Sequence, residues 1–472
     1  MSDKTTDDAA ISEAGASRLS IALVCVALVV AVIGSLGAPL ITPVATGLHV
    51  SLNAAQWTLT VTLFSGAIAG PLLGRLGSGS LRRLVILVCL AIVVIGGALT
   101  TLPLPFPLLL IGRGLQGVGL GGVPLLMSVA RAHLPAEKSA STIATLSVVS
   151  TVGIGVGYPV IGLLDQLAGL RAAYGLGLVL SIAALVIAWL VLPKEAPGPR
   201  PGIDWPGALL LCLGTLGALL VIAEPSTWNR PWVGASILVI TVVFLTAWAA
   251  VELRTSVPLV NLRLLGQPAV LRANLAMIVA GIGMYLLFSL LTRYLQTPSG
   301  APYGFGLPGV ASGAALIPFS ALGFVAGKAL PGLIARISNR WAYLVSAAAV
   351  MLAAAVFAAT LFAATSGSLI AVLVAMAVLG LGVGGISAAM PSLVLTGVPP
   401  AETASVLAIN QIVRSIGFSI GSALAGLLLA TATPAGGLLP TRQGYITATL
   451  WALLPLGLSG LVILIGGRRT PR

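Results

Sequence analysis

The feature that most constrains this chain is a series of long, uninterrupted apolar runs. Each is close to the roughly 20 residues that an α-helix needs to cross the hydrocarbon core of a bilayer, whereas strands of a membrane barrel alternate over about 10. The sequence therefore predicts an all-α integral membrane protein with 14 transmembrane helices. The expected helices cover residues 19–43, 52–74, 84–103, 106–131, 140–164, 171–193, 206–223, 232–252, 270–292, 306–331, 341–363, 367–395, 403–431 and 445–467.

The few charged residues support this count. They make up 7% of the 472 residues, far below the roughly 25% of soluble domains, which excludes a soluble enzyme. With a cytoplasmic N-terminus, 18 of the 24 Lys and Arg residues face the cytoplasm, which is the positive-inside pattern. We therefore expect an integral plasma (inner) membrane protein with both termini cytoplasmic. The net charge of +13 is assigned to topology and to anionic membrane lipid, not to nucleic acid.

Glycine-rich segments reveal an internal repeat. Residues 117–122 recur at 380–385, and three spaced glycines recur later by an almost constant offset. The repeat predicts two parallel six-helix bundles with two inserted central helices. The recurring spaced glycines are Gly153, Gly157 and Gly162, repeated as Gly417, Gly421 and Gly426. The expected organisation is a cytoplasmic N-terminal tail (1–18), a six-helix bundle (19–193), a linker (194–205), two inserted helices (206–254), a second linker (255–269), a second six-helix bundle (270–467) and a basic tail (468–472).

Enzyme chemistry has little support in the sequence. Both glycine segments fit G-x-G-x-x-G, but a dinucleotide site needs a preceding strand in a soluble βαβ unit. Close packing of membrane helices explains small residues better. We find no His/Cys/Asp cluster, no nucleophile elbow and no paired carboxylates. We therefore expect no enzyme, no metal and no cofactor.

Several motifs resemble the major facilitator superfamily. Residues 109–119 resemble its helix-4 motif, and residues 153–162 resemble the helix-5 motif of its drug exporters, with Tyr158 in place of a glycine. Residues 70–77 with the arginines at 82 and 83 resemble the loop between helices 2 and 3. Gln56-Trp57 is similar to the 14-helix drug:proton antiporter branch. The resemblance implies a permease that works by alternating access.

Acidic residues depart from that family pattern. Gly74 stands where the loop motif has an aspartate, and helix 1 lacks the acid of the 14-helix branch. None of the 11 acids lies near an expected membrane midplane. Asp165 is our first choice if protons are coupled, and a solvated helix cap is the alternative.

The candidate site residues fall into two groups. Arg113 is the leading one, because an intramembrane charge should face a cavity or a partner, unless it snorkels to the outer surface. The substrate or coupling candidates are Arg113, Gln116, Asp165, Tyr285, Phe288, Asn410, Gln411 and Arg414. The conformational candidates are Gly70, Arg75, Gly77, Arg82, Arg83, Glu137, Gly153, Gly157, Pro159, Gly162, Gly417 and Gly421. Glu137 with Arg82 or Arg83 forms either an inner latch or an ordinary solvated pair.

The predicted function is alternating-access efflux of small lipophilic or amphiphilic compounds, driven by the proton gradient, by a monomer. Two alternatives stay open. One is an uncoupled or importing metabolite carrier of the same fold, and the other is a membrane receptor or lipid-handling scaffold that transports nothing.

Overall fold

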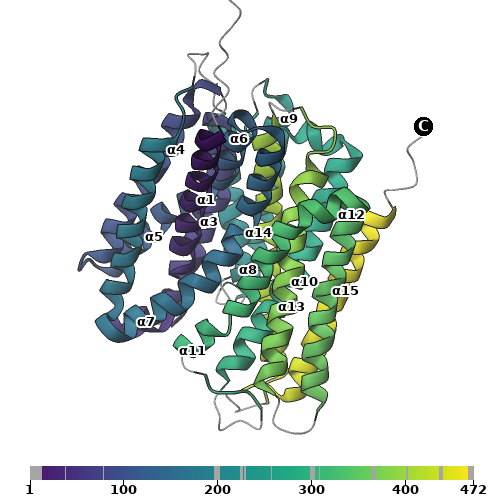
Figure 1. Ribbon diagram of the computed structural model, residues 1–472. Helices are drawn as coiled ribbons and strands as arrows, with labels where there is room; N and C mark the ends of the chain where they lie inside the picture. Colours follow the sequence, from purple (N-terminus) through teal and green to yellow (C-terminus); the bar gives the residue numbers. More distant parts are fainter. Residues whose placement is uncertain are drawn as a thin grey trace, which may run out of the picture.

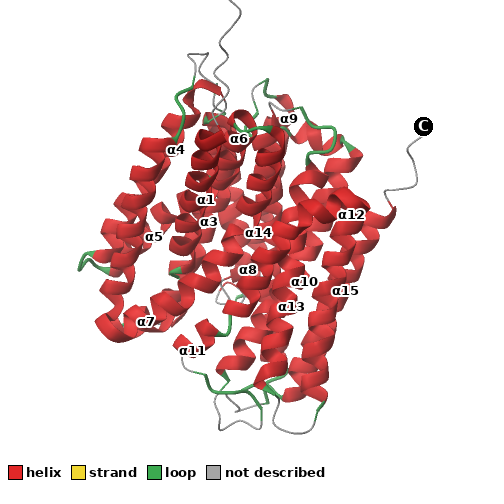
Figure 2. Cartoon of the chain, viewed as in Figure 1, coloured by secondary structure: helices red, strands yellow, loops and turns green. Residues whose placement is uncertain are grey.

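A computed structural model describes most of the chain as two helical bundles side by side (Figure 1). Within the described residues every regular element is a helix (Figure 2). Residues 1–12 and 466–472 lie outside this part, so most of the expected N-terminal tail and the whole basic tail are not covered. The described residues are 13–37, 39–50, 52–77, 79–195, 202, 204–223, 227, 230–256, 258–297, 303–307, 309–363, 368–399, 402–434 and 439–465.

The N-terminal bundle begins with helix α1 and ends with the long helix α7. Its α-helices are α1 (Glu13–Ser35), α2 (Ile41–Gly47), α3 (Leu52–Leu76), α4 (Arg82–Thr101), α5 (Phe106–Gly121), α6 (Val123–His133) and α7 (Ala136–Val191). The run expected at 106–131 is interrupted between α5 and α6, where Pro124 lacks the amide hydrogen of a continuous helix. Two expected helices are joined in α7, which bends at Gly169 with φ of 80°. Glycine adopts this backbone conformation without steric cost.

Two inserted helices and the C-terminal bundle complete the fold. The inserted helices are α8 (Trp205–Ala223) and α9 (Pro231–Arg254), followed by the 3₁₀-helix η3 (Leu262–Gly266). The C-terminal bundle contains α10 (Pro268–Gln296), α11 (Gly309–Ala314), α12 (Ile317–Phe362), α13 (Leu369–Val394), α14 (Thr403–Thr431) and α15 (Arg442–Ile465). Helix α12 joins two expected helices across a bend at Ser338, whose φ is 78°.

The predicted fold class is confirmed. Among the described residues, 12 helices are long and apolar enough to cross a membrane. This number and the expected 14 agree roughly, since one span covers both arms of α7 and α8 is represented only by the shorter apolar stretch Trp205–Ala218. All 14 expected segments contain helix.

The internal repeat is visible in how the glycines pack. A side chain at Gly117 would collide with the backbone of Thr62 on α3, and one at Gly380 would collide with the backbone of Phe319 on α12. Helices α3 and α5 of the N-terminal bundle correspond in the repeat to the first part of α12 and to α13. Small residues let membrane helices approach this closely, so the repeated sequence encodes the same helix contact twice.

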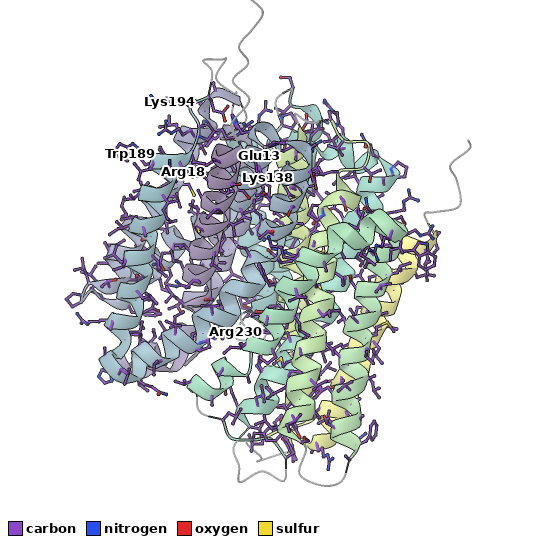
Figure 3. All side chains as sticks on the ribbon, viewed as in Figure 1. Glu13, Arg18, Lys138, Trp189, Lys194 and Arg230 are labelled. Atoms are coloured by element: carbon purple, nitrogen blue, oxygen red, sulfur yellow. The ribbon has the colours of Figure 1, made fainter. Side chains whose placement is uncertain are left out.

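Charged residues identify the two ends of the molecule. Glu13, Arg18, Lys138 and Lys194 lie together at the upper end, whereas Arg230 lies in the lower half (Figure 3). The first four were expected on the cytoplasmic side and Arg230 on the outer side. We use the name inner end for the end that carries the first four residues.

Candidate functional site

A cavity of about 60 Å³ lies between the two bundles, in the half nearer the inner end. Helices α1, α5, α6 and α7 line it from one bundle, and α10, α13 and α14 line it from the other. Most of its wall is apolar, formed by side chains such as Met127, Met277 and Met390. Its polar lining residues are Ser147, Ser387, Asn410, Gln411 and Arg414.

Three of the expected substrate contacts lie together on α14 at this cavity. Asn410 donates from Nδ2 to Oδ1 of Asn274 on α10 at 3.1 Å, which fixes its orientation. The guanidinium of Arg414 lies 5.8 Å from the ring centroid of Phe418. Within the described residues no acid pairs with Arg414. The cavity therefore presents one uncompensated positive charge among apolar side chains.

Arg113 is placed elsewhere, inside the N-terminal bundle. Its side chain is 0% exposed, which excludes snorkelling. Its Nε donates to the carbonyl of Thr58 on α3 at 3.2 Å, and its Nη1 donates to the carbonyl of Ile33 on α1 at 3.1 Å. Nη1 also donates to Oε1 of Gln116 at 2.7 Å. Arg113 and Gln116 thus join three helices and do not line the cavity.

The two aromatic candidates belong to a cluster in the C-terminal bundle. Tyr285 stacks on Phe418 with ring centroids 5.0 Å apart, and Phe288 lies 5.2 Å from Phe319. Since Phe418 also lies 5.8 Å from the Arg414 guanidinium, this aromatic cluster adjoins the cation of the cavity. Asp165 is half-buried on α7, four residues before the bend at Gly169.

The glycine-rich part of α7 forms the main seam between the bundles. A side chain at Gly155 would collide with Ser320 on α12, and one at Gly313 of α11 would lie 3.0 Å from the backbone nitrogen of Pro159. Gly162 lies near Val310 of α11. Gly153 and Gly157 face α1, as Gly417 and Gly421 face α10 in the other bundle. One helix therefore packs tightly against both bundles.

The loop-motif residues contact neighbours at the inner end. A Cβ atom added at Gly70 would lie 4.0 Å from the backbone of Gly121 on α5. A Cβ atom added at Gly77 would collide with the side chain of Leu125 on α6. Arg75 donates from Nε to the carbonyl of Gly202 at 3.4 Å.

The expected partner of the arginine pair is replaced by another acid. Arg82 forms an ion pair with Glu195 at 2.9 Å, and Arg83 donates to the carbonyl of Trp189 at 2.7 Å. Glu137 is exposed in the first turn of α7. All of these residues belong to the N-terminal bundle or directly follow it, so the observed ion pair does not bridge the two bundles.

The structure also brings together two acids that the sequence analysis did not pair. Asp204 directly precedes α8, and Glu252 lies in the last turn of α9. Both carboxylates lie next to Gly207, with Glu252 Oε1 at 3.3 Å from the position of a side chain there. Each residue lies near an expected cytoplasmic end of a helix, where an acid is normally exposed. No feature of the sequence therefore predicted that these two acids are buried.

Comparison with protein families decides the class of the chain. The family model of the Major Facilitator Superfamily matches residues 19–422. The chain belongs to the Major Facilitator Superfamily. The resemblance noted in the sequence motifs is thereby confirmed, and it extends over most of the chain. This superfamily consists of transporters and not of enzymes.

Several members of the superfamily with named roles are similar to this chain. The chain is 27% identical over 398 residues to the cephamycin export protein CmcT of Amycolatopsis lactamdurans, covering 81% of this chain and 78% of that protein. It is 27% identical over 451 residues to the puromycin resistance protein pur8 of Streptomyces alboniger, covering 89% and 86%. An uncharacterized MFS-type transporter of Mycobacterium tuberculosis is 26% identical over 63% of this chain, which spans 43% of that protein's length.

Solved structures of the superfamily share the fold. The POT family transporter PepTSo aligns with a TM-score of 0.65 at 15% identity, covering 96% of this chain and 99% of that one. The human organic anion transporter MFSD10 aligns with a TM-score of 0.62 at 16% identity, covering 94% and 99%.

Proposed function

We propose that this superfamily member exports small amphiphilic compounds by alternating access. The observation that carries the proposal is the cavity between the bundles, with an apolar wall and the cation of Arg414. An apolar wall with a few polar groups is typical of small-molecule sites, but sites for drug-sized ligands measure about 300–1,000 Å³, so this proposal requires the cavity to widen when a compound binds. The relatives named for cephamycin export and puromycin resistance support the direction and the class of compound.

The two bundles supply the moving parts of this proposal. Helix α7 packs against α11 and α12 along one seam, and α3 packs against α14 along the other. Rocking of the bundles about the central site exposes it to each side of the membrane in turn. The glycines of α7 allow the first seam to close without side chains between the helices.

We further propose that the protein is a monomer in the plasma membrane, with cytoplasmic termini, and that the proton gradient drives export. The charge distribution supports this orientation. Binding of a substrate needs no cofactor in this scheme. The substrate meets Arg414, Asn410 and Gln411, and surrounding lipid contacts the apolar outer surface.

The test is uptake into proteoliposomes that contain the purified protein. A set of fluorescent amphiphiles, matched in size and either anionic or cationic, is offered with and without an imposed pH gradient. We expect gradient-dependent accumulation of the anionic members, abolished by a protonophore. Equal transport with and without the gradient identifies an uncoupled carrier and contradicts proton coupling. Binding of the amphiphiles without any transport contradicts the permease itself.

A further inference from the structure

An arginine lies at the inner end of the seam between α4 and the second arm of α7, the part that follows the bend at Gly169. The two helices pack directly, since a Cβ atom added at Gly97 would lie 3.0 Å from the Cα of Leu178. At the inner end of this seam, Nη2 of Arg83 donates to the carbonyl of Trp189 at 2.7 Å. Trp189 belongs to the last turn of α7, where carbonyls lack a partner within the helix. This contact uses one of the five N–H donors of the guanidinium.

Lys194 adds a second positive charge at this place. It follows the end of α7 and is exposed, and within the described chain neither Lys194 nor Arg83 pairs with an acid. The next residue, Glu195, is held by other groups, since its Oε1 lies 2.9 Å from Nη1 of Arg82 and 3.0 Å from Nε2 of His133. Arg82 and Glu195 neutralise each other, so the charges of Arg83 and Lys194 remain uncompensated.

Both helices present apolar side chains outward beside these cations. Leu84 and Val88, one turn apart on α4, are exposed, and so is Leu190 on α7. Trp189 is 61% exposed, and it lies with Lys194 on one flank near the inner end (Figure 3). Exposed tryptophans and basic residues are typical of the membrane–water interface, above a surface that contacts acyl chains.

We infer that this seam binds an anionic phospholipid of the inner leaflet. The phosphodiester lies between Arg83 and Lys194, and the acyl chains follow the exposed faces of α4 and α7. The planar guanidinium matches two phosphate oxygens, and the ammonium adds a point charge. A zwitterionic headgroup carries its own ammonium, which these cations repel, so the site prefers a net negative lipid. The bound headgroup joins α4 to the segment that leads from α7 toward the inserted helices.

The internal repeat builds a similar contact in the second bundle. Arg340, near the start of the second arm of α12, donates from Nη2 to the carbonyl of Leu464 in the last turn of α15. These helices correspond in the repeat to α4 and to the second arm of α7. The neighbouring Trp341 is exposed, as Trp189 is. The chain that follows α15 lies outside the described residues, so the inference is confined to the first bundle.

Quenching of tryptophan fluorescence tests the site directly. The purified full-length protein is placed in nanodiscs of zwitterionic lipid that contain a small fraction of phosphatidylglycerol or phosphatidylcholine with brominated acyl chains. The chain has eight tryptophans, so the signal of Trp189 is the part that is lost in Trp189→Phe. We expect half-quenching of this signal at an about tenfold lower fraction of brominated phosphatidylglycerol than of brominated phosphatidylcholine. Trp451, exposed on α15 and measured in the same way with Trp451→Phe, should show no preference.

Charge variants separate this site from the general potential of the inner surface. We expect the preference for phosphatidylglycerol to fall several-fold in Lys194→Gln and to disappear in Arg83→Gln. The matched control Arg18→Gln removes an exposed charge of α1 at the same end of the molecule and should retain the preference. Equal quenching by both lipids in the wild type, or an equal loss in Arg18→Gln and Lys194→Gln, overturns the site. Lys194→Gln is the deciding variant if Arg83→Gln yields no folded protein.

A competition experiment distinguishes a lipid headgroup from a free anion. Inorganic phosphate is added to the nanodiscs and compared with chloride at the same ionic strength. We expect no displacement of brominated phosphatidylglycerol, because the buried acyl chains contribute to its binding. Recovery of the Trp189 signal with phosphate alone identifies a site for a free anion and contradicts the lipid site.

This inference goes beyond the proposed function and does not rest on it. None of these measurements uses a transported compound or a gradient. A preference for phosphatidylglycerol in a protein that transports nothing leaves the lipid site standing and contradicts the permease. Transport by a protein whose Trp189 is quenched equally by both lipids leaves the proposed function standing and removes the lipid site.

Discussion

The two bundles repeat each other in sequence but differ at their centres. Arg113 and Gln116 on α5 correspond, by the repeat, to Met376 and Leu379 on α13, and all four side chains are buried. The N-terminal bundle is held by a cation that binds backbone carbonyls, whereas its counterpart is held by apolar packing. The cation that lines the cavity, Arg414, comes from the apolar bundle instead. A buried arginine in this fold is therefore not by itself evidence for substrate contact.

The largest effect should follow from placing a charged residue in the apolar core of the C-terminal bundle. Met376→Arg places a charge among fully buried apolar side chains such as Val372 and Leu379. Insertion of an arginine at the centre of a membrane helix costs roughly 2.5–3.5 kcal/mol, and a packed neighbourhood adds a steric cost. We expect little folded protein in the membrane fraction, measured by size-exclusion chromatography of a fluorescent fusion. A monodisperse, abundant variant would show that the second bundle can also accommodate a cation.

The reverse change should be severe but smaller. Arg113→Met removes the donors to Thr58, Ile33 and Gln116 from a buried position. Hydrogen bonds to charged groups contribute about 1.5–3 kcal/mol, so we expect a clear loss of thermal stability in detergent. The control Met376→Leu conserves volume and should cost less than about 1.5 kcal/mol. Equal stability of the two variants contradicts a structural role for Arg113.

Arg414 should behave in the opposite way, with little effect on stability and a large effect on substrates. Arg414→Gln keeps a polar side chain in the cavity but removes its charge. We expect KM for anionic amphiphiles to rise about tenfold, equivalent to about 1.4 kcal/mol, with cationic amphiphiles affected far less. The measurement is initial uptake into proteoliposomes, with thermal unfolding as the control. An equal rise in KM for anionic and cationic amphiphiles would contradict an electrostatic contact between Arg414 and the substrate.

The smallest stability effect, with a larger functional effect, is expected at the α7 seam. Gly155→Ala introduces a methyl group that collides with Ser320, whereas Gly426→Ala on α14 meets open space. Both changes raise helix propensity by up to about 1 kcal/mol, so their difference isolates the seam. We expect transport to fall several-fold only in Gly155→Ala, with its Tm within a few degrees of the control. Full transport in Gly155→Ala contradicts close approach at this seam during the cycle.

The sequence predicted the fold because a bilayer imposes a simple rule on length and polarity. Apolar runs located the helices, and the repeated glycines indicated equivalent contacts in the two bundles. The candidate site was harder to predict. A polar side chain such as Arg113 can face a cavity or a neighbouring backbone, and hydropathy does not fix the rotation of a helix. The pairing of Asp204 with Glu252 depends on how the linkers fold, which apolar periodicity does not encode.

Because backbone carbonyls hold the Arg113 side chain in place, this residue affects the electrical behaviour of the protein. Its positive charge is fixed rigidly to one bundle, inside the membrane, and no acid cancels it among the described residues. An elementary charge that crosses a membrane potential exchanges about 2.3 kcal/mol per 100 mV. Any rocking of the bundle moves this charge through part of that field. The conformational cycle should therefore respond to voltage even in steps that carry neither a proton nor a substrate.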